Sequence, residues 1–464
     1  METTPRELTL QPGLRVHMIG VGGVGMSALA AILAGRGLSV SGSDRCESPR
    51  LDALRALGVR VSVPQVAGGA AGADVVVRSA AIAESNPELA DARARGLPVF
   101  ERADLLAEIV RGLHKVAVAG THGKTTTTAM LGTILLECGR DATVIVGGDA
   151  ANLEGKNYHV GPEPLAVFEA CESDSTFLRY GPCSEVITNV EADHLDQHGD
   201  FAGLCRAFEQ FVALVPDDGF LAYGAESEVL AEMARRARGE RISFGLGGRF
   251  MFGADRIQLR PFGATFRLLI EGRPAGEVEL RVPGEHNVRN ALAALAAATR
   301  LEVGVGQAAE ALGEFRGVGR RFELLGKLGE APVIDDYAHH PTEVSATLAA
   351  ARRGWPDRRV AAIFQPHLFS RTRDFMAQFA AALAQADVVI VTEIYAARED
   401  PIEGVRGQDL AAAVAELAPA AEVRFIPSRE EIVAAVRELA RPGDLILTLG
   451  AGDIRQVGEE LAWR

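Results

Sequence analysis

The sequence contains little cysteine, and its cysteines are not paired. Five occur among 464 residues, and no two of them form a CxxC motif. An odd number without metal-ligand spacing argues against a disulfide framework and against a structural zinc site. The first residues, 1–5, also lack the basic and then apolar pattern of a secretory signal. We therefore expect a protein of a reducing, cytoplasmic compartment.

The sequence also lacks an excess of positive charge and a convincing membrane span. The 62 acidic residues outnumber the 48 basic ones and give a net charge of -14, which argues against nucleic acid or an anionic membrane surface as a partner. Residues 18–35 carry no charge, and about 18 residues is the lower limit for a span. Because four glycines lie within 20–25, a strand, a turn and a helix start explain this segment better. We expect neither a nucleic acid nor a membrane as partner.

Strand and helix patterns alternate along almost the whole chain. This alternation is typical of α/β layers with mainly parallel sheets. At roughly 150 residues per domain, the length predicts three domains. A helical pattern over 101–111 stops at Gly112, and the Gly- and Arg-rich segment 315–321 has the composition of a second linker. We therefore predict domains at 1–112, 113–316 and 317–464.

A first glycine loop follows the predicted strand 16–19. Gly20, Gly22 and Gly25 form GxGxxG ahead of a helix of small residues, and Asp44 follows the next strand. This is the dinucleotide fingerprint in its usual context. The glycines let the backbone approach a pyrophosphate, and the helix N-terminus favours negative charge. Because such a loop binds phosphates and not the base, NAD, another pyrophosphate such as a UDP-sugar, and a tight turn without ligand all stay open.

A second glycine loop follows the predicted strand 115–119, where residues 120–128 read GTHGKTTTT. The usual GxxxxGK[ST] needs glycine where Val118 stands, so this loop is shortened to GxxGKT. Backbone N–H groups can still hold phosphate oxygens. Lys124 would neutralise the β- and γ-phosphates, and Thr125 would bind Mg²⁺. A lysine that only caps a helix is the alternative. Two such loops suggest two phosphate-bearing ligands, which a simple dehydrogenase does not need.

Acidic and imidazole side chains follow two later strands. Glu169 ends the predicted strand 165–169, at the sheet edge where α/β proteins place ligand-binding groups. Oxygens of Thr125 and Glu169 with the imidazole of His194 could hold Mg²⁺, which keeps waters and phosphates as further ligands. A solvated acidic loop is the alternative. We expect that alternative for three neighbouring residues: Glu172, Asp196 and His198.

The motifs together resemble those of the Mur ligases. Five of them occur in order: GTHGKTTTT, NVEADHLD at 189–196, GEHNVRNALAA at 284–294, GRRFE at 319–323 and DDYAHHPTE at 335–343. GVGGVGM at 20–26 and SGSD at 41–44 narrow the resemblance to the branch of the family that adds L-alanine. The ordered set covers essentially the whole chain.

The resemblance implies an enzyme that uses ATP and Mg²⁺ to join L-alanine to the lactyl carboxylate of UDP-N-acetylmuramate, a step of peptidoglycan precursor synthesis. It implies a Rossmann-like N-terminal domain that binds the UDP-sugar. The ligand of the first glycine loop would then be this UDP-sugar and not a nicotinamide cofactor. The resemblance further implies a central P-loop-type ATPase domain with a mainly parallel sheet and a Rossmann-like C-terminal domain that binds the amino acid. The protein would be a monomer or a homodimer.

The resemblance also implies roles for individual residues. The UDP-sugar site comprises Gly20, Gly22, Gly23, Gly25, Asp44 and Ser79. The ATP site comprises Gly120, Thr121, His122, Gly123, Lys124, Thr125, Thr126, His286, Asn287, Asn290, Arg321 and Asp336. The amino-acid site comprises Tyr337, His339 and Arg371, and the metal site comprises Thr125, Glu169 and His194. The catalytic groups are Lys124, His194, Arg321 and His339.

The chain departs from the pattern of its relatives at two positions. Cys171 stands where relatives commonly carry a third acidic residue, and Leu368 replaces an arginine of some members. Arg371 and Arg373 could also form a solvated basic face. Three other functions stay open. One is a sister ligase that loads a preformed peptide onto the same sugar, and one is a folylpolyglutamate-type ligase, which shares the shortened loop but should lack the N-terminal GVGGVGM domain. The third is a regulator that binds ATP without using it.

Overall fold

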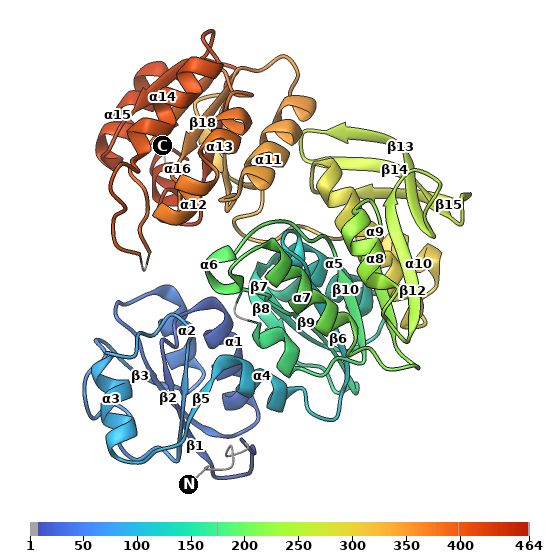
Figure 1. Ribbon diagram of the computed structural model, residues 1–464, viewed down its shortest axis with the longest axis vertical. Helices are drawn as coiled ribbons and strands as arrows, with labels where there is room; N and C mark the ends of the chain where they lie inside the picture. Colours follow the sequence, from blue (N-terminus) through green and yellow to red (C-terminus); the bar gives the residue numbers. More distant parts are fainter. Residues whose placement is uncertain (1–7, 174, 398, 463–464) are drawn as a thin grey trace. The chain divides into compact units, whose positions relative to one another are not determined.

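The computed structural model describes residues 8–173, 175–397 and 399–462. It divides into two compact units. The first comprises 1–149 with 153–242, and the second comprises 150–152 with 243–464. Figure 1 labels the elements of both units.

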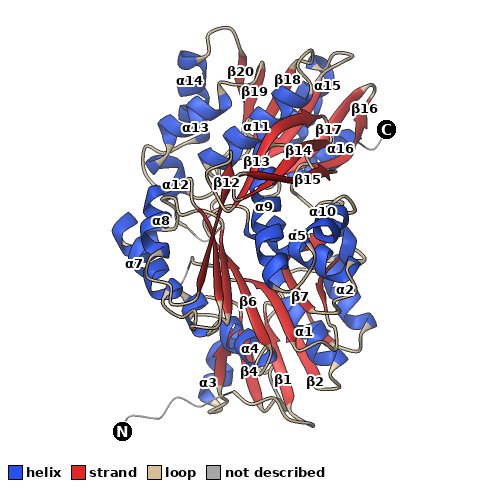
Figure 2. Cartoon of the chain, turned by 90° about the vertical axis from the view of Figure 1, so that its right-hand side faces the viewer, coloured by secondary structure: helices blue, strands red, loops and turns tan. Residues whose placement is uncertain are grey.

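The first sheet of the first unit is parallel and has the strand order β3-β2-β1-β4-β5. Figure 2 shows β1, β2 and β4 side by side. The strands are β1 (Arg15–Ile19), β2 (Ser39–Ser43), β3 (Arg60–Ser62), β4 (Val75–Arg78) and β5 (Val99–Glu101). The helices are α1 (Val24–Gly35), α2 (Pro49–Ala56), α3 (Pro87–Ala94) and α4 (Arg102–Ile109). The strand order reverses between β1 and β4, which is where open α/β sheets bind ligands.

The second sheet of this unit runs in the order β11-β10-β6-β9-β7-β8. The strands are β6 (His114–Ala119), β7 (Thr143–Ala150), β8 (Lys156–His159), β9 (Leu165–Glu169), β10 (Ser184–Ile187) and β11 (Phe220–Gly224). The helical segments are α5 (Lys124–Glu137), η1 (Ala151–Leu153), η2 (Thr176–Arg179), α6 (Leu195–His198), α7 (Phe201–Val212) and α8 (Glu228–Ala234). The neighbours of β6 are β9 and β10, both parallel to it, so the segments after these three strands meet at one edge.

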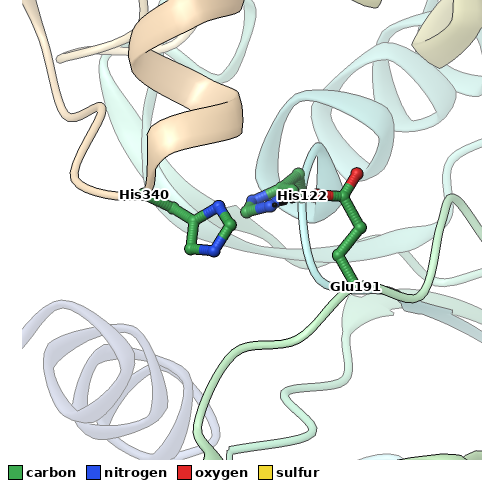
Figure 3. A group of neighbouring side chains, drawn as sticks. All are labelled: His122, Glu191 and His340. Atoms are coloured by element: carbon green, nitrogen blue, oxygen red, sulfur yellow. Dashed lines mark ion pairs between the residues drawn. The ribbon is translucent and has the colours of Figure 1, made fainter. Parts of the chain in front are cut away.

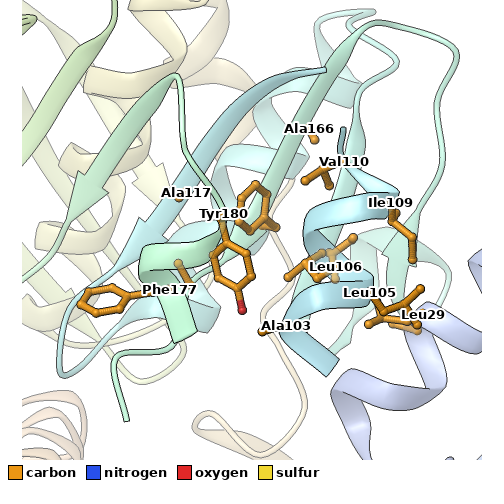
Figure 4. Close-up of a cluster of buried hydrophobic side chains, with 14 of the residues drawn as sticks. Leu29, Ala103, Leu105, Leu106, Ile109, Val110, Ala117, Ala166, Phe177 and Tyr180 are labelled. Atoms are coloured by element: carbon orange, nitrogen blue, oxygen red, sulfur yellow. The ribbon is translucent and has the colours of Figure 1, made fainter. Parts of the chain in front are cut away.

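One hydrophobic core joins the two sheets of the first unit. Figure 4 shows Leu106 of α4 toward Tyr180 and Leu105 of α4 beside Leu29 of α1, with Ala117 of β6 and Ala166 of β9 in the same cluster. The Tyr180 ring meets Phe168 edge to face, with 5.3 Å between centroids. Burial of this apolar surface holds the two glycine loops within one unit.

The second unit begins within β12 (Glu240–Leu246) and first forms an antiparallel ribbon. The ribbon consists of β13 (Phe252–Arg260), β14 (Gly263–Ile270) and β15 (Arg273–Leu280), and α9 (Glu285–Arg300) and α10 (Val305–Leu312) follow it. The apolar side of α9 is almost continuous in alanine and leucine and is buried. These contacts fix the start of α9, where three predicted site residues lie.

The last sheet has the order β16-β17-β21-β18-β19-β20 and is parallel except for β16. Its strands are β16 (Glu323–Leu328), β17 (Ala331–Asp336), β18 (Val360–Phe364), β19 (Val388–Val391), β20 (Glu422–Phe425) and β21 (Leu445–Leu449). Its helices are α11 (Pro341–Gly354), α12 (Phe369–Asp374), α13 (Met376–Leu383), α14 (Gly407–Leu417), α15 (Arg429–Leu439) and α16 (Arg455–Ala462).

The structure confirms the predicted α/β class with mainly parallel sheets. The strand predicted at 165–169 has these bounds. Strand β10 ends at Ile187, and the side chains of the next two residues, Thr188 and Asn189, bond to the second glycine loop. The domain boundaries at 112 and 316 stay predictions. In the described part of the chain, every helix is too short or too polar to cross a bilayer.

Candidate functional site

The second glycine loop runs from the end of β6 into the N-terminus of α5. Gly120 has φ of +124°, and a Cβ there would overlap the Thr188 hydroxyl, so this position requires glycine. Gly123 is left-handed and precedes the first residue of α5. The N–H of Thr121 donates to the Asn189 carbonyl at 3.0 Å. The loop is thereby fixed against the end of β10 with a helix N-terminus behind it, which suits an anion.

Lys124 folds back over this loop. Its Nζ donates to the carbonyls of Gly120 at 2.6 Å and Thr121 at 3.0 Å, and it pairs with the Glu172 carboxylate at 2.9 Å. Burial lowers the pKa of Lys124, but the negative charges of Glu172 and Glu169 outweigh it, so the net shift is upward. Lys124 therefore keeps its positive charge at neutral pH.

Glu172 differs from the expectation. It was expected on a solvated acidic loop, but its side chain is only 1% exposed and it is the ion-pair partner of Lys124. The imidazole of His198, also expected in solvent, contacts the Glu172 carbonyl at 2.9 Å. The side chain of Asp196 lies outside the described part of the chain. When a loop sequence contains several acidic residues, the sequence alone does not show which of them is buried and pairs with a lysine.

Thr125 and Glu169 meet at the end of β9. The Thr125 hydroxyl donates to Glu169 Oε2 at 2.8 Å, and the Gly147 N–H donates to the same oxygen at 3.0 Å. A Cβ at Gly147 would overlap that carboxylate. The geometry thus brings together two of the three predicted metal ligands, both of them hard oxygens of the kind that Mg²⁺ prefers.

The remaining predicted residues at this edge of the sheet are Thr121, His122, Thr126 and His194, and their contacts and burial differ. Figure 3 shows the ion pair of His122 with Glu191, which spans 3.6 Å. Thr121 and Thr126 are buried. His194 has a positive φ of 53° and precedes α6, with its Nε2 3.7 Å from Asp193. Its roles as metal ligand and base stay predictions.

The first glycine loop is held by the end of β2. The Ser43 carbonyl accepts hydrogen bonds from the N–H groups of Gly20 at 2.8 Å and Val21 at 3.0 Å. The predicted site residue Asp44 accepts the Gly22 N–H at 2.8 Å. Gly23 then precedes the first residue of α1. Asp44 therefore shapes this loop from the protein side.

A cavity of about 260 Å³ lies between the first glycine loop and the end of β9. Its lining includes Gly23, Gly25 and Ser79 from the first sheet and Glu169 and Cys171 from the second. Among the lining residues that the sequence did not predict is Arg102, whose side chain lies 3.2 Å from the Cβ position at Gly25. The cavity connects predicted UDP-sugar residues with a predicted metal ligand.

In the second unit, the N-terminus of α9 carries His286, Asn287 and Asn290. The Asn287 amide donates to the Pro283 carbonyl at 2.7 Å, and the Asn290 amide donates to Asn287 at 3.2 Å. Burial, together with the charges of Arg289 and Arg321, lowers the pKa of His286 to about 4. The imidazole is therefore neutral at physiological pH, as contact with an uncharged base would require.

We expect the His286 ring to show no titration between pH 5 and pH 8 and a midpoint near 4. Because the folded pKa lies below the unfolded one of about 6.5, its contribution to stability is complete above pH 6.5 and is lost as the pH falls toward 4. Histidine ring resonances measured by NMR, assigned with His286→Gln, test this. A midpoint near 6.5 would contradict it.

Asp336 is the last residue of β17, and its side chain contacts the segments just before and just after this hairpin. Its carboxylate accepts the N–H groups of Phe322 at 2.9 Å and Ala338 at 2.8 Å. Burial outweighs the opposing charge of Arg321 and, with a smaller contribution from the charge of Glu343, raises the pKa of Asp336 to about 6. Arg321 itself lies over the Tyr337 ring and 3.6 Å from Glu343. Both predicted residues are therefore engaged with the segment that follows residue 316.

The residues predicted to bind the amino acid cluster with two residues that the sequence did not predict, His367 and Tyr395. His339 lies against the Tyr337 ring on one side and the His367 ring on the other, with centroids 5.1 and 5.8 Å apart. His367 stacks on Tyr395 and contacts the Arg371 guanidinium at 3.4 Å. Arg371 is buried, so the alternative interpretation, in which it belongs to a solvated basic face, is wrong for this residue. Arg373 is half exposed and pairs with Asp374.

Comparison with known proteins decides the family. Three family models match in order, a Mur ligase family catalytic domain at 15–114, a Mur ligase middle domain at 118–298 and a Mur ligase glutamate ligase domain at 320–452. A UDP-N-acetylmuramate–L-alanine ligase from Sorangium cellulosum is 44% identical, covering 95% of this chain and 94% of the relative. The chain belongs to the Mur ligase family.

Solved structures of Mur ligases agree with this placement. The crystal structure of the UDP-N-acetylmuramate-alanine ligase MurC from Thermotoga maritima matches with a TM-score of 0.83 and 31% identity, covering 97% of this chain and 98% of that one. A murein peptide ligase from Psychrobacter arcticus matches with a TM-score of 0.74 and 26% identity, covering 97% and 98%. The fold is thus that of Mur ligases over nearly its full length.

Cys171 is the departure that lies at the edge where the metal ligands are predicted. Burial raises the pKa of its thiol, with a further contribution from Glu172 and opposing effects of Lys124 and Ser173. The thiol donates to the Ser173 hydroxyl at 3.1 Å. A neutral thiol supplies no carboxylate oxygen, so Glu169 is the stronger metal-ligand candidate of the two residues that line the cavity.

Proposed function

We propose that this Mur ligase uses ATP to join L-alanine to the lactyl carboxylate of UDP-N-acetylmuramate, in peptidoglycan precursor synthesis. The L-alanine-adding relatives named above support this assignment. The observation that carries it is the cavity lined by Gly23, Gly25 and Ser79 on one side and Glu169 on the other. A sugar diphosphate held at the first loop would direct its carboxylate toward the second loop.

The donor set at the second loop fits Mg²⁺. The Thr125 hydroxyl and the Glu169 carboxylate are hard oxygens 2.8 Å apart, and Mg²⁺ needs only one or two protein oxygens beside waters and phosphates. His194 is the third proposed ligand. When bound, the ion would neutralise charge on the β- and γ-phosphates.

The reaction needs an activated carboxylate, because oxide is a poor leaving group. The lactyl carboxylate attacks the γ-phosphorus of ATP, the bond to ADP breaks and an acyl phosphate forms. The neutral alanine amine then attacks the acyl carbon, and the tetrahedral intermediate expels phosphate. Lys124 and Arg321 stabilise the charge that develops in these steps. His194 or His339 is the base that takes the proton from the amine.

The second unit supplies the remaining sites of the proposal. His286, Asn287 and Asn290 hold the adenine, and Asp336 holds the ribose. Tyr337, His339 and Arg371 hold L-alanine. The neutral imidazole of His286 and the ring cluster around His339 support these assignments.

The protein acts in the cytoplasm, as a monomer or a homodimer. The five cysteines are free in the structure, which suits a reducing compartment. Size-exclusion chromatography with light scattering decides between the two assembly states.

Substrate competition tests the proposal against its nearest rival. The structure also matches a murein peptide ligase, so L-alanine and a preformed tripeptide are offered together with UDP-N-acetylmuramate and ATP. We expect mass spectrometry to find the alanyl product alone. A peptide-bearing product in excess would contradict the assignment.

Arg102 offers a test of the cavity. We expect Arg102→Gln to raise KM for UDP-N-acetylmuramate by about tenfold, because it removes one charged contact of roughly 1.5 kcal/mol with the diphosphate or sugar. KM for ATP should not change. Arg111→Gln is the matched control, since Arg111 pairs with Glu108 near the end of the same helix and is mostly exposed. Equal effects of the two substitutions would contradict this role.

A further inference from the structure

A buried polar network lies behind the first glycine loop, outside the cavity. Its centre is Glu88, the second residue of α3, whose side chain is fully buried. One carboxylate oxygen lies 2.9 Å from His17 Nε2, and the other accepts the Ser43 hydroxyl. His17 Nδ1 in turn lies 2.9 Å from the Ser41 hydroxyl. The network thus joins α3 to β1 and β2.

The surroundings of Glu88 are built to receive a carboxylate. The N–H of Glu88 donates to the Asn86 side chain at 3.0 Å, which fixes the first turn of α3. A Cβ at Gly69 would overlap Glu88 Oε1, so that position leaves room for the carboxylate only as glycine. Burying a carboxylate costs free energy unless its oxygens are hydrogen-bonded. Here His17 and Ser43 provide those bonds.

Ser43 connects this network to the loop. Its side chain bonds to Glu88, while its carbonyl accepts the N–H groups of Gly20 and Val21. The next residue, Asp44, accepts the N–H of Gly22. Three successive N–H groups of the loop are therefore fixed by the end of β2, and the end of β2 is fixed from behind by Glu88.

We propose that Glu88 is a positioning residue for the UDP-sugar site, acting through Ser43 on the first glycine loop. This inference rests on the proposed function of that loop. Glu88 does not line the cavity and contacts no substrate. Its hydrogen bond to Ser43 sets where the loop presents its backbone to the sugar diphosphate, and loss of that bond weakens UDP-sugar binding while leaving the ATP loop intact.

The test compares Glu88→Ala with Glu88→Gln in steady-state kinetics. We expect Glu88→Ala to raise KM for UDP-N-acetylmuramate by about tenfold, with kcat and KM for ATP within about twofold of the wild type. Glutamine can accept the Ser43 hydroxyl and donate to His17, so Glu88→Gln should restore KM to within about threefold. A glutamine variant as weak as the alanine variant would overturn the proposal.

Asp91→Asn is the matched control on the same helix. Asp91 accepts the Gly68 N–H at 3.0 Å and pairs with Arg95 at 2.8 Å, so it helps to dock α3 without touching Ser43. We expect its KM values to match those of the wild type. A rise equal to that of Glu88→Ala would mean that α3 docking alone matters, and would overturn the proposal.

Two further measurements keep the outcomes distinct. If Glu88→Ala does not fold, Ser43→Ala decides: a KM for UDP-N-acetylmuramate raised about tenfold supports the positioning role, and an unchanged KM overturns it. Calorimetry with UDP-N-acetylmuramate on the wild type separates the two levels of inference. Absence of binding there refutes the function proposed for the loop, whereas wild-type binding with unchanged affinity in both variants refutes only the role of Glu88.

Discussion

Replacement of Lys124 by alanine is expected to abolish turnover while the fold survives. Lys124 keeps its charge because the carboxylates of Glu172 and Glu169 raise its pKa more than burial lowers it. In the proposed reaction this charge meets the phosphoryl group as negative charge develops. Loss of one such preorganised donor lowers kcat by about 10³-fold.

The same substitution has a predictable structural cost. It leaves the Glu172 carboxylate, which is 1% exposed, without its ion-pair partner, and breaking a buried pair costs about 3–5 kcal/mol. The double variant Lys124→Ala/Glu172→Gln removes the stranded charge. We expect it to recover most of the stability in a urea titration and none of the activity. A single or double variant with normal turnover would refute the role of Lys124.

Among the substitutions considered, replacement of Glu185 on β10 is expected to stabilise the protein most. Its side chain is fully buried between β6 and β11, opposite Ala117 and Leu221. Neither carboxyl oxygen has a hydrogen-bond partner among the described residues. Burial raises the pKa of Glu185 well above its ordinary value, so the group is neutral in the folded protein over a wider pH range than in the unfolded chain.

Glu185→Leu should therefore raise the free energy of unfolding by about 2 kcal/mol near pH 5, since it removes an unsatisfied buried polar group of similar size. The gain should grow with pH. The wild type loses stability as the pH rises from the ordinary carboxyl pKa toward the raised one, by about 1.4 kcal/mol per pH unit, and the variant lacks this loss. Urea titrations at pH 5 and pH 8 measure both effects. A variant less stable than the wild type, or a difference independent of pH, would contradict the account of Glu185.

The sequence predicted the parts of the site that local patterns determine. A strand, a glycine loop and a helix start occur together at Gly20 and again at Gly120, because phosphate binding needs that local geometry. The contact of Thr125 with Glu169 was also predictable, since parallel strands end at one edge of a sheet.

The rest depended on contacts between distant segments. Glu172 looked like one acid among several, and only the fold places it beside Lys124. Arg102 and Glu88 belong to helices without a recognisable motif, and their positions behind or beside the first loop follow from how α3 and α4 pack on the sheet. His367 and Tyr395 are brought together by pairing between two loops. A single sequence carries no signal for such contacts.

In the proposed reaction, one site couples ATP cleavage to amide formation between two specific partners. Phosphate release by the purified protein, measured with each substrate omitted in turn, tests this coupling most directly. We expect phosphate release only when ATP, UDP-N-acetylmuramate and L-alanine are all present, with one alanyl product formed per phosphate. Phosphate released at the same rate without L-alanine or without the UDP-sugar, or ATP bound and never cleaved, would contradict it.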